Sequence, residues 1–135
     1  MISVRNEVRI TVASDADILV AREKGRALAT ELGFSAMDST FVATAISELA
    51  RNIVTHAKRG EIALVVLENS DRRGLQVVAS DEGPGIADVS RALQNGHLSG
   101  SLGLGLPGVR RLMDDFEILS EVGSGTKISV KKWLG

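Results

Sequence analysis

The order of strand-like and helix-like patterns limits the folds available to this chain of 135 residues. Apolar residues alternate in five short segments, as in half-buried strands, and recur at helical spacing in three segments. The strands cluster more than they alternate with helices, which favours an α+β fold over a doubly wound parallel sheet. We therefore expect a two-layer sandwich, with helices on one face of a mixed β-sheet. The expected strands cover residues 4–12, 61–67, 75–79, 116–120 and 127–133, and the expected helices run from about 15 to 33, 39 to 57 and 106 to 114.

Boundary signals and apolar stripes support the helices. Ser14 stands before the first helix and Gly33 after it, as expected for a cap and a stop. Pro107 falls in the first turn of the third helix, where proline is well tolerated. The residues expected to face the core are Ile18, Ala21, Ala27, Leu28 and Leu32 in the first helix, and Phe41, Ala45, Ile46, Leu49 and Ile53 in the second.

Composition argues against several classes of protein. The formal net charge of -1 and the aromatic content of 3% argue against a basic or stacking surface for nucleic acid. No apolar run approaches the roughly 20 residues of a membrane span, and the start has no signal-peptide core. The absence of cysteine fits a reducing compartment. We expect one domain over residues 1–135, located in the cytoplasm, that binds neither nucleic acid nor membrane.

Three polar residues recur at intervals of four on the second helix. Glu48 and Asn52 lie about 40° apart on one helix face, and His56 follows one turn later. An amide oxygen can ligate Mg²⁺, which takes oxygen ligands and keeps several waters. A carboxylate one turn away can orient or deprotonate an attacking hydroxyl. Taken alone, the same spacing also fits a solvated helix face, with His56 packed at the helix end.

Glycine-rich segments occupy the second half of the chain. Asp81, Gly83, Gly85 and Ile86 follow an expected strand, where a carboxylate can accept a hydrogen bond from the exocyclic amine of adenine. The alternative is a plain Asp-Gly turn.

A second glycine-rich segment, 100–108, runs into the third helix. Glycines before a helix expose unpaired amides at the positive end of the dipole, which suits a phosphate. The segment matches neither a Walker motif nor a dinucleotide fingerprint. Residues 123–126 form a third glycine turn, which alone indicates only a hairpin.

Read in order, these motifs resemble the GHKL superfamily of ATPases and kinases, which share the Bergerat ATP-binding fold. The resemblance spans nearly the whole chain and rests on Glu48-x-x-x-Asn52-x-x-x-His56-Ala57, Asp81-x-Gly83-x-Gly85-Ile86, Gly103-Leu104-Gly105-Leu106 and Gly123-Ser124-Gly125-Thr126. Segments 45–53, 105–114 and 132–134 look most like the RsbT-type switch kinases of the bacterial stressosome. That family implies ATP and Mg²⁺ as cofactors, phosphorylation of Ser or Thr on STAS-domain scaffold or antagonist proteins, and later activation of a protein phosphatase by binding.

The resemblance also implies roles for individual residues. Asn52 would ligate Mg²⁺, Glu48 would act as the general base, and Asp81 would bind the adenine amine with help from Gly85 and Thr126. The backbone near Gly103 and Gly105 would hold the phosphates, and an ATP lid would lie between Ile86 and Leu102. The implied ATP-binding residues are Asn52, His56, Asp81, Gly83, Gly85, Ile86, Gly103, Leu104, Gly105, Leu106 and Thr126.

Two other functions share these motifs. An anti-sigma factor of the same fold would use the same ATP site but would act mainly by sequestering a sigma factor. A non-catalytic, nucleotide-gated binding module is disfavoured by Glu48, because a pure binder has little need of a base beside the metal ligand. A histidine-kinase fragment and a gyrase-type ATPase are not expected, because neither a dimerising helix nor a transducer domain is recognisable.

Overall fold

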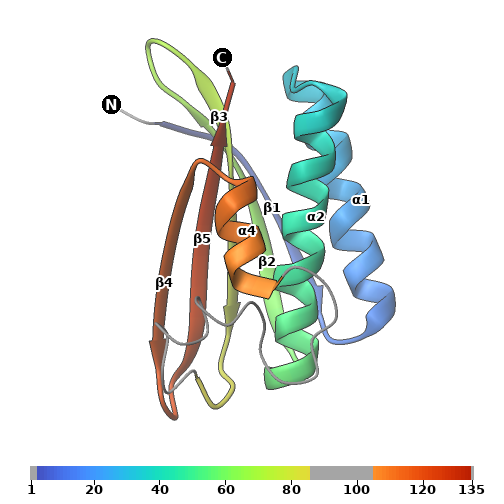
Figure 1. The fold of residues 1–135 in the computed structure, drawn as a ribbon, viewed down its shortest axis with the longest axis vertical. Helices are drawn as coiled ribbons and strands as arrows, with labels where there is room; N and C mark the ends of the chain where they lie inside the picture. The colour runs from blue at the N-terminus through green and yellow to red at the C-terminus, as the bar shows by residue number, and fades with distance from the viewer. Residues whose placement is uncertain (1–2, 86–104, 135) are drawn as a thin grey trace.

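The computed structural model describes residues 3–85 and 105–134, with three helices and a short π-helix packed on a five-stranded sheet (Figure 1). No helix in the described part of the chain is long and apolar enough to cross a membrane. The elements in chain order are β1 (Ser3–Val12), α1 (Asp15–Leu32), α2 (Ala36–Asn52), the π-helix η1 (Ile53–Ala57), β2 (Gly60–Glu68), β3 (Arg73–Asp81), α4 (Gly105–Leu112), β4 (Asp115–Glu121) and β5 (Gly125–Trp133).

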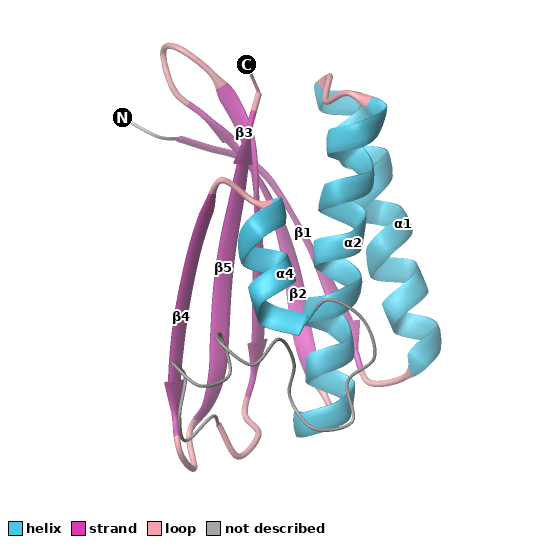
Figure 2. Cartoon of the chain, in the orientation of Figure 1, coloured by secondary structure: helices cyan, strands magenta, loops and turns pink. Residues whose placement is uncertain are grey.

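The sheet has the strand order β1-β2-β3-β5-β4, and the helices cover one face of it (Figure 2). The predicted α+β sandwich is therefore confirmed, but a mixed sheet is wrong, because all four pairings between described strands are antiparallel. Two helices separate β1 from β2, so the chain returns in the opposite direction. The strands β3 and β4, which α4 separates along the chain, run in the same direction. They do not pair with each other, because β5 lies between them and pairs antiparallel with both.

The helix boundaries follow from local hydrogen bonds. The Ser14 side chain accepts the Asp17 N–H at the start of α1, and Gly33 ends that helix with a φ of 104°. The Ser35 hydroxyl accepts the Asp38 N–H at 3.1 Å, so α2 begins at Ala36, earlier than predicted. At its other end the predicted helix continues to Ala57, but its last five residues are wound as the π-helix.

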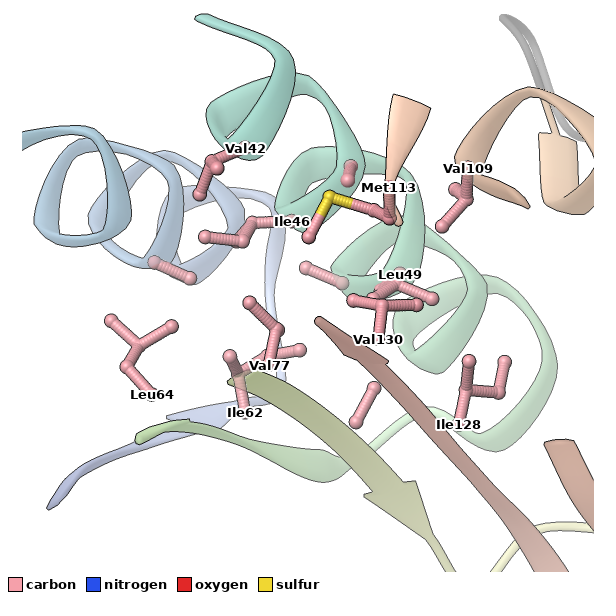
Figure 3. Close-up of a cluster of buried hydrophobic side chains, with 14 of the residues drawn as sticks. Val42, Ile46, Leu49, Ile62, Leu64, Val77, Val109, Met113, Ile128 and Val130 are labelled. Atoms are coloured by element: carbon pink, nitrogen blue, oxygen red, sulfur yellow. The ribbon is translucent and has the colours of Figure 1, made fainter. Parts of the chain in front are cut away.

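The core lies between the helices and the inner face of the sheet (Figure 3). Most of the predicted stripe residues belong to it, but Ala27 is exposed and Phe41 is only partly buried. Gly25 faces the core from α1, because a Cβ atom there would collide with the Cδ1 atom of Ile46. Glycine is not counted as apolar when helical periodicity is read from a sequence. The predicted stripe of the first helix therefore included Ala27 in place of Gly25. In α2, Val42 is fully buried next to the partly buried Phe41.

Candidate functional site

A cavity of about 230 Å³ lies between the C-terminal part of α2 with η1 and the ends of β3 and β5. Apolar side chains form much of its wall, and a few polar groups converge on it, as is typical of sites for small molecules. It brings together Asn52, His56, Asp81, Gly85 and Thr126, which the sequence had placed in one ATP site. The other lining residues are Leu49, Ile53, Ala79, Pro84 and Ile128.

The π-helix forms part of the cavity wall through Ile53 and His56. The regular α-helix ends at Asn52, and the wider winding of Ile53–Ala57 carries His56. Such π turns are uncommon and are often found at functional sites. Lys58 ends the segment with a φ of 67°, an unusual backbone conformation for a residue with a side chain. Asn52 and His56 therefore enter the cavity from two different helical windings.

Asp81 occupies the end of β3, directly opposite Thr126 of β5 in the sheet register. Its Oδ1 atom accepts the Gly83 N–H at 2.9 Å, which fixes the carboxylate in an Asp-Gly turn. That turn was the alternative interpretation of the motif, and it coexists with a position on the cavity wall. The Oδ2 atom is not engaged by Gly83 and can accept a hydrogen bond from a ligand.

Gly83 brings the turn close to η1. A Cβ atom at this position would lie 2.6 Å from the Cβ atom of Ala57, a separation that two carbon atoms cannot adopt. Gly83 does not line the cavity, and its contribution to ATP binding stays a prediction.

A hydroxyl pair holds the opposite side of the cavity. The Thr126 Oγ1 atom lies 2.8 Å from the Ser120 Oγ atom on β4, and either hydroxyl can donate. When Ser120 donates its one hydrogen to the Gly125 carbonyl at 3.3 Å, Thr126 is the donor of the pair. Ser120 is not among the predicted site residues, although a hairpin register built around Gly123 and Gly125 pairs it with Thr126.

Glu48 does not line the cavity. Its side chain is only 7% exposed, and its Oε2 atom accepts the Gly105 N–H at 3.3 Å. Gly105 is the first residue of α4, so the carboxylate lies at the positive end of that helix. Leu106 is 1% exposed and packs in the core, so only its backbone is available to a ligand. The predicted site residues Ile86, Gly103 and Leu104 lie outside the described residues.

Comparison with known proteins places the chain in a family. Residues 11–132 match the histidine kinase-like ATPase domain. The chain belongs to the histidine kinase-like ATPase domain family. It is 45% identical over 126 residues to the serine/threonine-protein kinase RsbT of Bacillus subtilis (strain 168), which covers 93% of this chain and 95% of that protein. The expected GHKL membership and the likeness to RsbT-type kinases are confirmed.

Two further relatives bear on the fold and on the alternative function. The anti-sigma F factor of Caldanaerobacter subterraneus subsp. tengcongensis is 28% identical over 124 residues, covering 85% of this chain and 84% of that one. A crystal structure of the RsbU and RsbW domains of a Mycobacterium tuberculosis protein superposes with a TM-score of 0.61 at 20% identity. It covers 95% of this chain and 32% of that chain, and it confirms the fold alone.

In this ATPase-family fold, Gly85 packs against the backbone of the β4–β5 hairpin. Its φ is 78°, and a Cβ atom would strike the Glu121 carbonyl oxygen. Gly123 has a similar φ of 85° and open space around it, which makes it a matched control. We expect Gly123→Ala to cost about 1–2 kcal/mol of unfolding free energy, and Gly85→Ala about 2–4 kcal/mol because overpacking adds to the φ strain. Urea unfolding measures both, and equal losses would contradict the packing described.

His56 is held in a partly desolvated position of the same ATPase fold. Burial lowers its pKa from 6.5, partly opposed by the negative charge of Asp81. Within the described residues its buried Nε2 atom has no hydrogen-bond partner. The neutral imidazole is therefore the form that the folded protein favours.

A pH dependence follows from that pKa shift. A histidine with a lowered folded pKa binds fewer protons when folded, so stability is complete above pH 6.5 and decreases as the pH falls below it. We expect the free energy of unfolding of His56→Gln to decrease less than that of the wild type as the pH falls. Chemical denaturation at pH 7.5 and pH 5.5 compares the two proteins, and His97 is common to both. An identical pH dependence in both would show that His56 titrates normally.

Proposed function

We propose that this protein is a Mg-ATP-dependent protein serine/threonine kinase, with residues 1–135 acting as one kinase domain. The observation that carries the proposal is the cavity, in which Asp81 and Thr126 face each other across β3 and β5 while Asn52 and His56 enter from the helical layer. The 45% identity to a protein named as a serine/threonine kinase supports the same activity.

The adenine ring would occupy the apolar part of the cavity. Asp81 would accept the exocyclic amine, and the Thr126 hydroxyl would bind the adjacent ring edge directly or through water. Leu49, Ile53 and Ile128 would cover the ring faces. The Asp81 carboxylate can only accept a hydrogen bond from the base. The site therefore favours adenine, which presents an amine, over bases that present a carbonyl at that position.

Asn52 lies beside the base site and supplies one neutral oxygen. A single amide ligand suits Mg²⁺, which completes its octahedron with phosphate oxygens and water. When bound, Mg²⁺ would neutralise negative charge on the phosphates. The backbone at Gly105, the first residue of α4, would bind a phosphate oxygen at the positive end of the helix.

Phosphoryl transfer then requires a base near the target hydroxyl. The Ser or Thr oxygen of the partner forms a bond to the γ-phosphorus, the bond from that phosphorus to the β–γ bridging oxygen breaks, and ADP leaves with its electron pair. The Glu48 carboxylate takes the hydroxyl proton and later returns it to solvent. Most of the rate comes from positioning and charge neutralisation.

Partner switching gives the kinase its role in the cell. The substrate would be a STAS-domain scaffold or antagonist protein in the cytoplasm, where ATP is available. After transfer, the kinase would leave this substrate and activate a protein phosphatase by binding it, in a stress-response pathway that controls a sigma factor. The likeness to RsbT supports this assignment.

An anti-sigma kinase is the alternative, because anti-sigma F factors are relatives over 85% of this chain. Both functions need the same ATP site, so the partner must decide between them. Size-exclusion chromatography of the protein with Mg-ATP and sigma factors from the same genome separates the two. A stable complex with a sigma factor would favour the alternative, whereas phosphorylation of a STAS-domain protein without such a complex supports the switch kinase.

Asn52→Ala tests the metal ligand. We expect ATP affinity measured with Mg²⁺ to fall to nearly the value measured without it, because the protein oxygen that links cation and nucleotide is removed. Calorimetric titrations with and without Mg²⁺ give that ratio, and Asn6→Ala on the exposed part of β1 is the control. A wild-type Mg²⁺ effect that survives in Asn52→Ala would assign the cation to another residue.

A further inference from the structure

Glu48 is buried and accepts a hydrogen bond from the backbone of Gly105, and a general base requires neither feature. Among the residues that the structure describes, it is the one buried charged side chain. A carboxylate removed from water needs compensating hydrogen bonds or charges. The Gly105 N–H supplies one, and the dipole of α4 adds favourable charge at the same point. Glu48 therefore has a defined position at the start of α4 as well as its proposed chemistry.

Charged side chains from other elements hold α4 at both ends. Glu48 of α2 accepts from its first residue, while the Lys132 Nζ atom of β5 donates to the carbonyl of its last residue, Leu112, at 3.0 Å. A carboxylate at the N-terminus and an ammonium group at the C-terminus both complement the helix dipole. Because Lys132 anchors the far end, an exchange of partners at Gly105 does not require α4 to leave its place.

The Gly105 N–H is also the group that the proposed function gives to a phosphate oxygen. One N–H carries one hydrogen, and a carboxylate and a phosphate oxygen bound to it would bring two negative charges close together. In a site shielded from water that repulsion is strong. Glu48 and the phosphate chain therefore exclude each other at this amide.

We propose that a nucleotide phosphate displaces the Glu48 carboxylate from the Gly105 N–H, so that binding the phosphates releases the base. This inference rests on the proposed function, since it assumes that ATP occupies the cavity. While it accepts the Gly105 hydrogen bond, Oε2 is directed to the backbone of α4 and is occupied by that contact. Once displaced, the carboxylate is free to accept the hydroxyl proton.

Such an exchange couples the two events in both directions. If phosphate binding weakens the bond between Glu48 and Gly105, that bond must weaken phosphate binding by the same factor. Wild-type ATP affinity is therefore lower than the amides of α4 alone would give. Adenosine has no phosphate, so its affinity is independent of Glu48.

Glu48→Gln separates charge from hydrogen bonding, because glutamine keeps an acceptor oxygen for the Gly105 N–H but carries no charge. We expect calorimetry without Mg²⁺ to give ATP binding about tenfold tighter than wild type, with adenosine binding unchanged. Glu82→Gln, an exposed position in the turn after β3, removes the same charge away from α4 and is the control. An ATP affinity that stays constant or falls in Glu48→Gln, or an equal gain for adenosine, would overturn the proposal.

Amide NMR on the wild-type protein gives an independent readout that needs no variant at Glu48. We expect ATP to shift the Gly105 amide resonance strongly and adenosine to leave it in place. A Gly105 resonance that does not respond to ATP would overturn the exchange while ATP binding itself stands. If neither ATP nor adenosine binds any of these proteins, the proposed function fails, and the exchange fails with it.

Discussion

Asp81→Asn is expected to weaken ATP binding by about 100-fold or more while the protein remains folded. The substitution replaces a charged acceptor by an amide whose nitrogen would oppose the adenine amine, and losing a charge-assisted hydrogen bond at a buried site costs about 2–3 kcal/mol or more. The asparagine oxygen can still accept the Gly83 N–H that Asp81 accepts now. The turn after β3 is therefore preserved.

Calorimetry with ATP and with adenosine measures this effect. Both ligands should lose affinity in parallel, because the contact is to the base and not to the phosphates. Asp71→Asn, in the exposed turn between β2 and β3, is the charge-matched control and should bind normally. Unchanged ATP affinity in Asp81→Asn would remove Asp81 from the adenine site.

Glu48→Gln is expected to reduce phosphoryl transfer by about 100- to 10,000-fold, the usual contribution of a general base. ATP binding should be at least as tight as in the wild type, because Glu48 makes no contact with the base site and its negative charge opposes the phosphates at Gly105. Single-turnover transfer to the protein substrate measures the chemical step, with Glu82→Gln as control. Transfer near the wild-type rate would make Glu48 a structural partner of α4 and nothing more.

The sequence was most informative where periodicity and boundary residues act locally. The five strands and three helices were predicted within a few residues, because alternation, Ser14 and Gly33 determine structure over short distances. The π-helix was not predicted, since no residue in 53–57 distinguishes it from a continued α-helix. The sheet was wrongly expected to be mixed, because the position of β5 between β3 and β4 is a long-range property.

The candidate site shows the same limit. Motif order predicted that Asn52, His56, Asp81, Gly85 and Thr126 belong together, and the cavity brings them together. The burial of Glu48 against Gly105 could not be predicted, since it depends on how α4 packs on α2. Ser120 was missed because only the register of the β4–β5 hairpin, and no motif of its own, places it beside Thr126.

Mass spectrometry of phosphoryl transfer tests the kinase assignment most directly. The protein and Mg-ATP would be mixed with a STAS-domain protein from the same genome, with Asp81→Asn as the blank. We expect one phosphoserine or phosphothreonine on the STAS-domain protein, with an equal amount of ADP, formed with the wild type and not with Asp81→Asn. An unmodified STAS-domain protein, under conditions in which ATP is bound, would contradict the kinase assignment and would favour a nucleotide-gated binding protein.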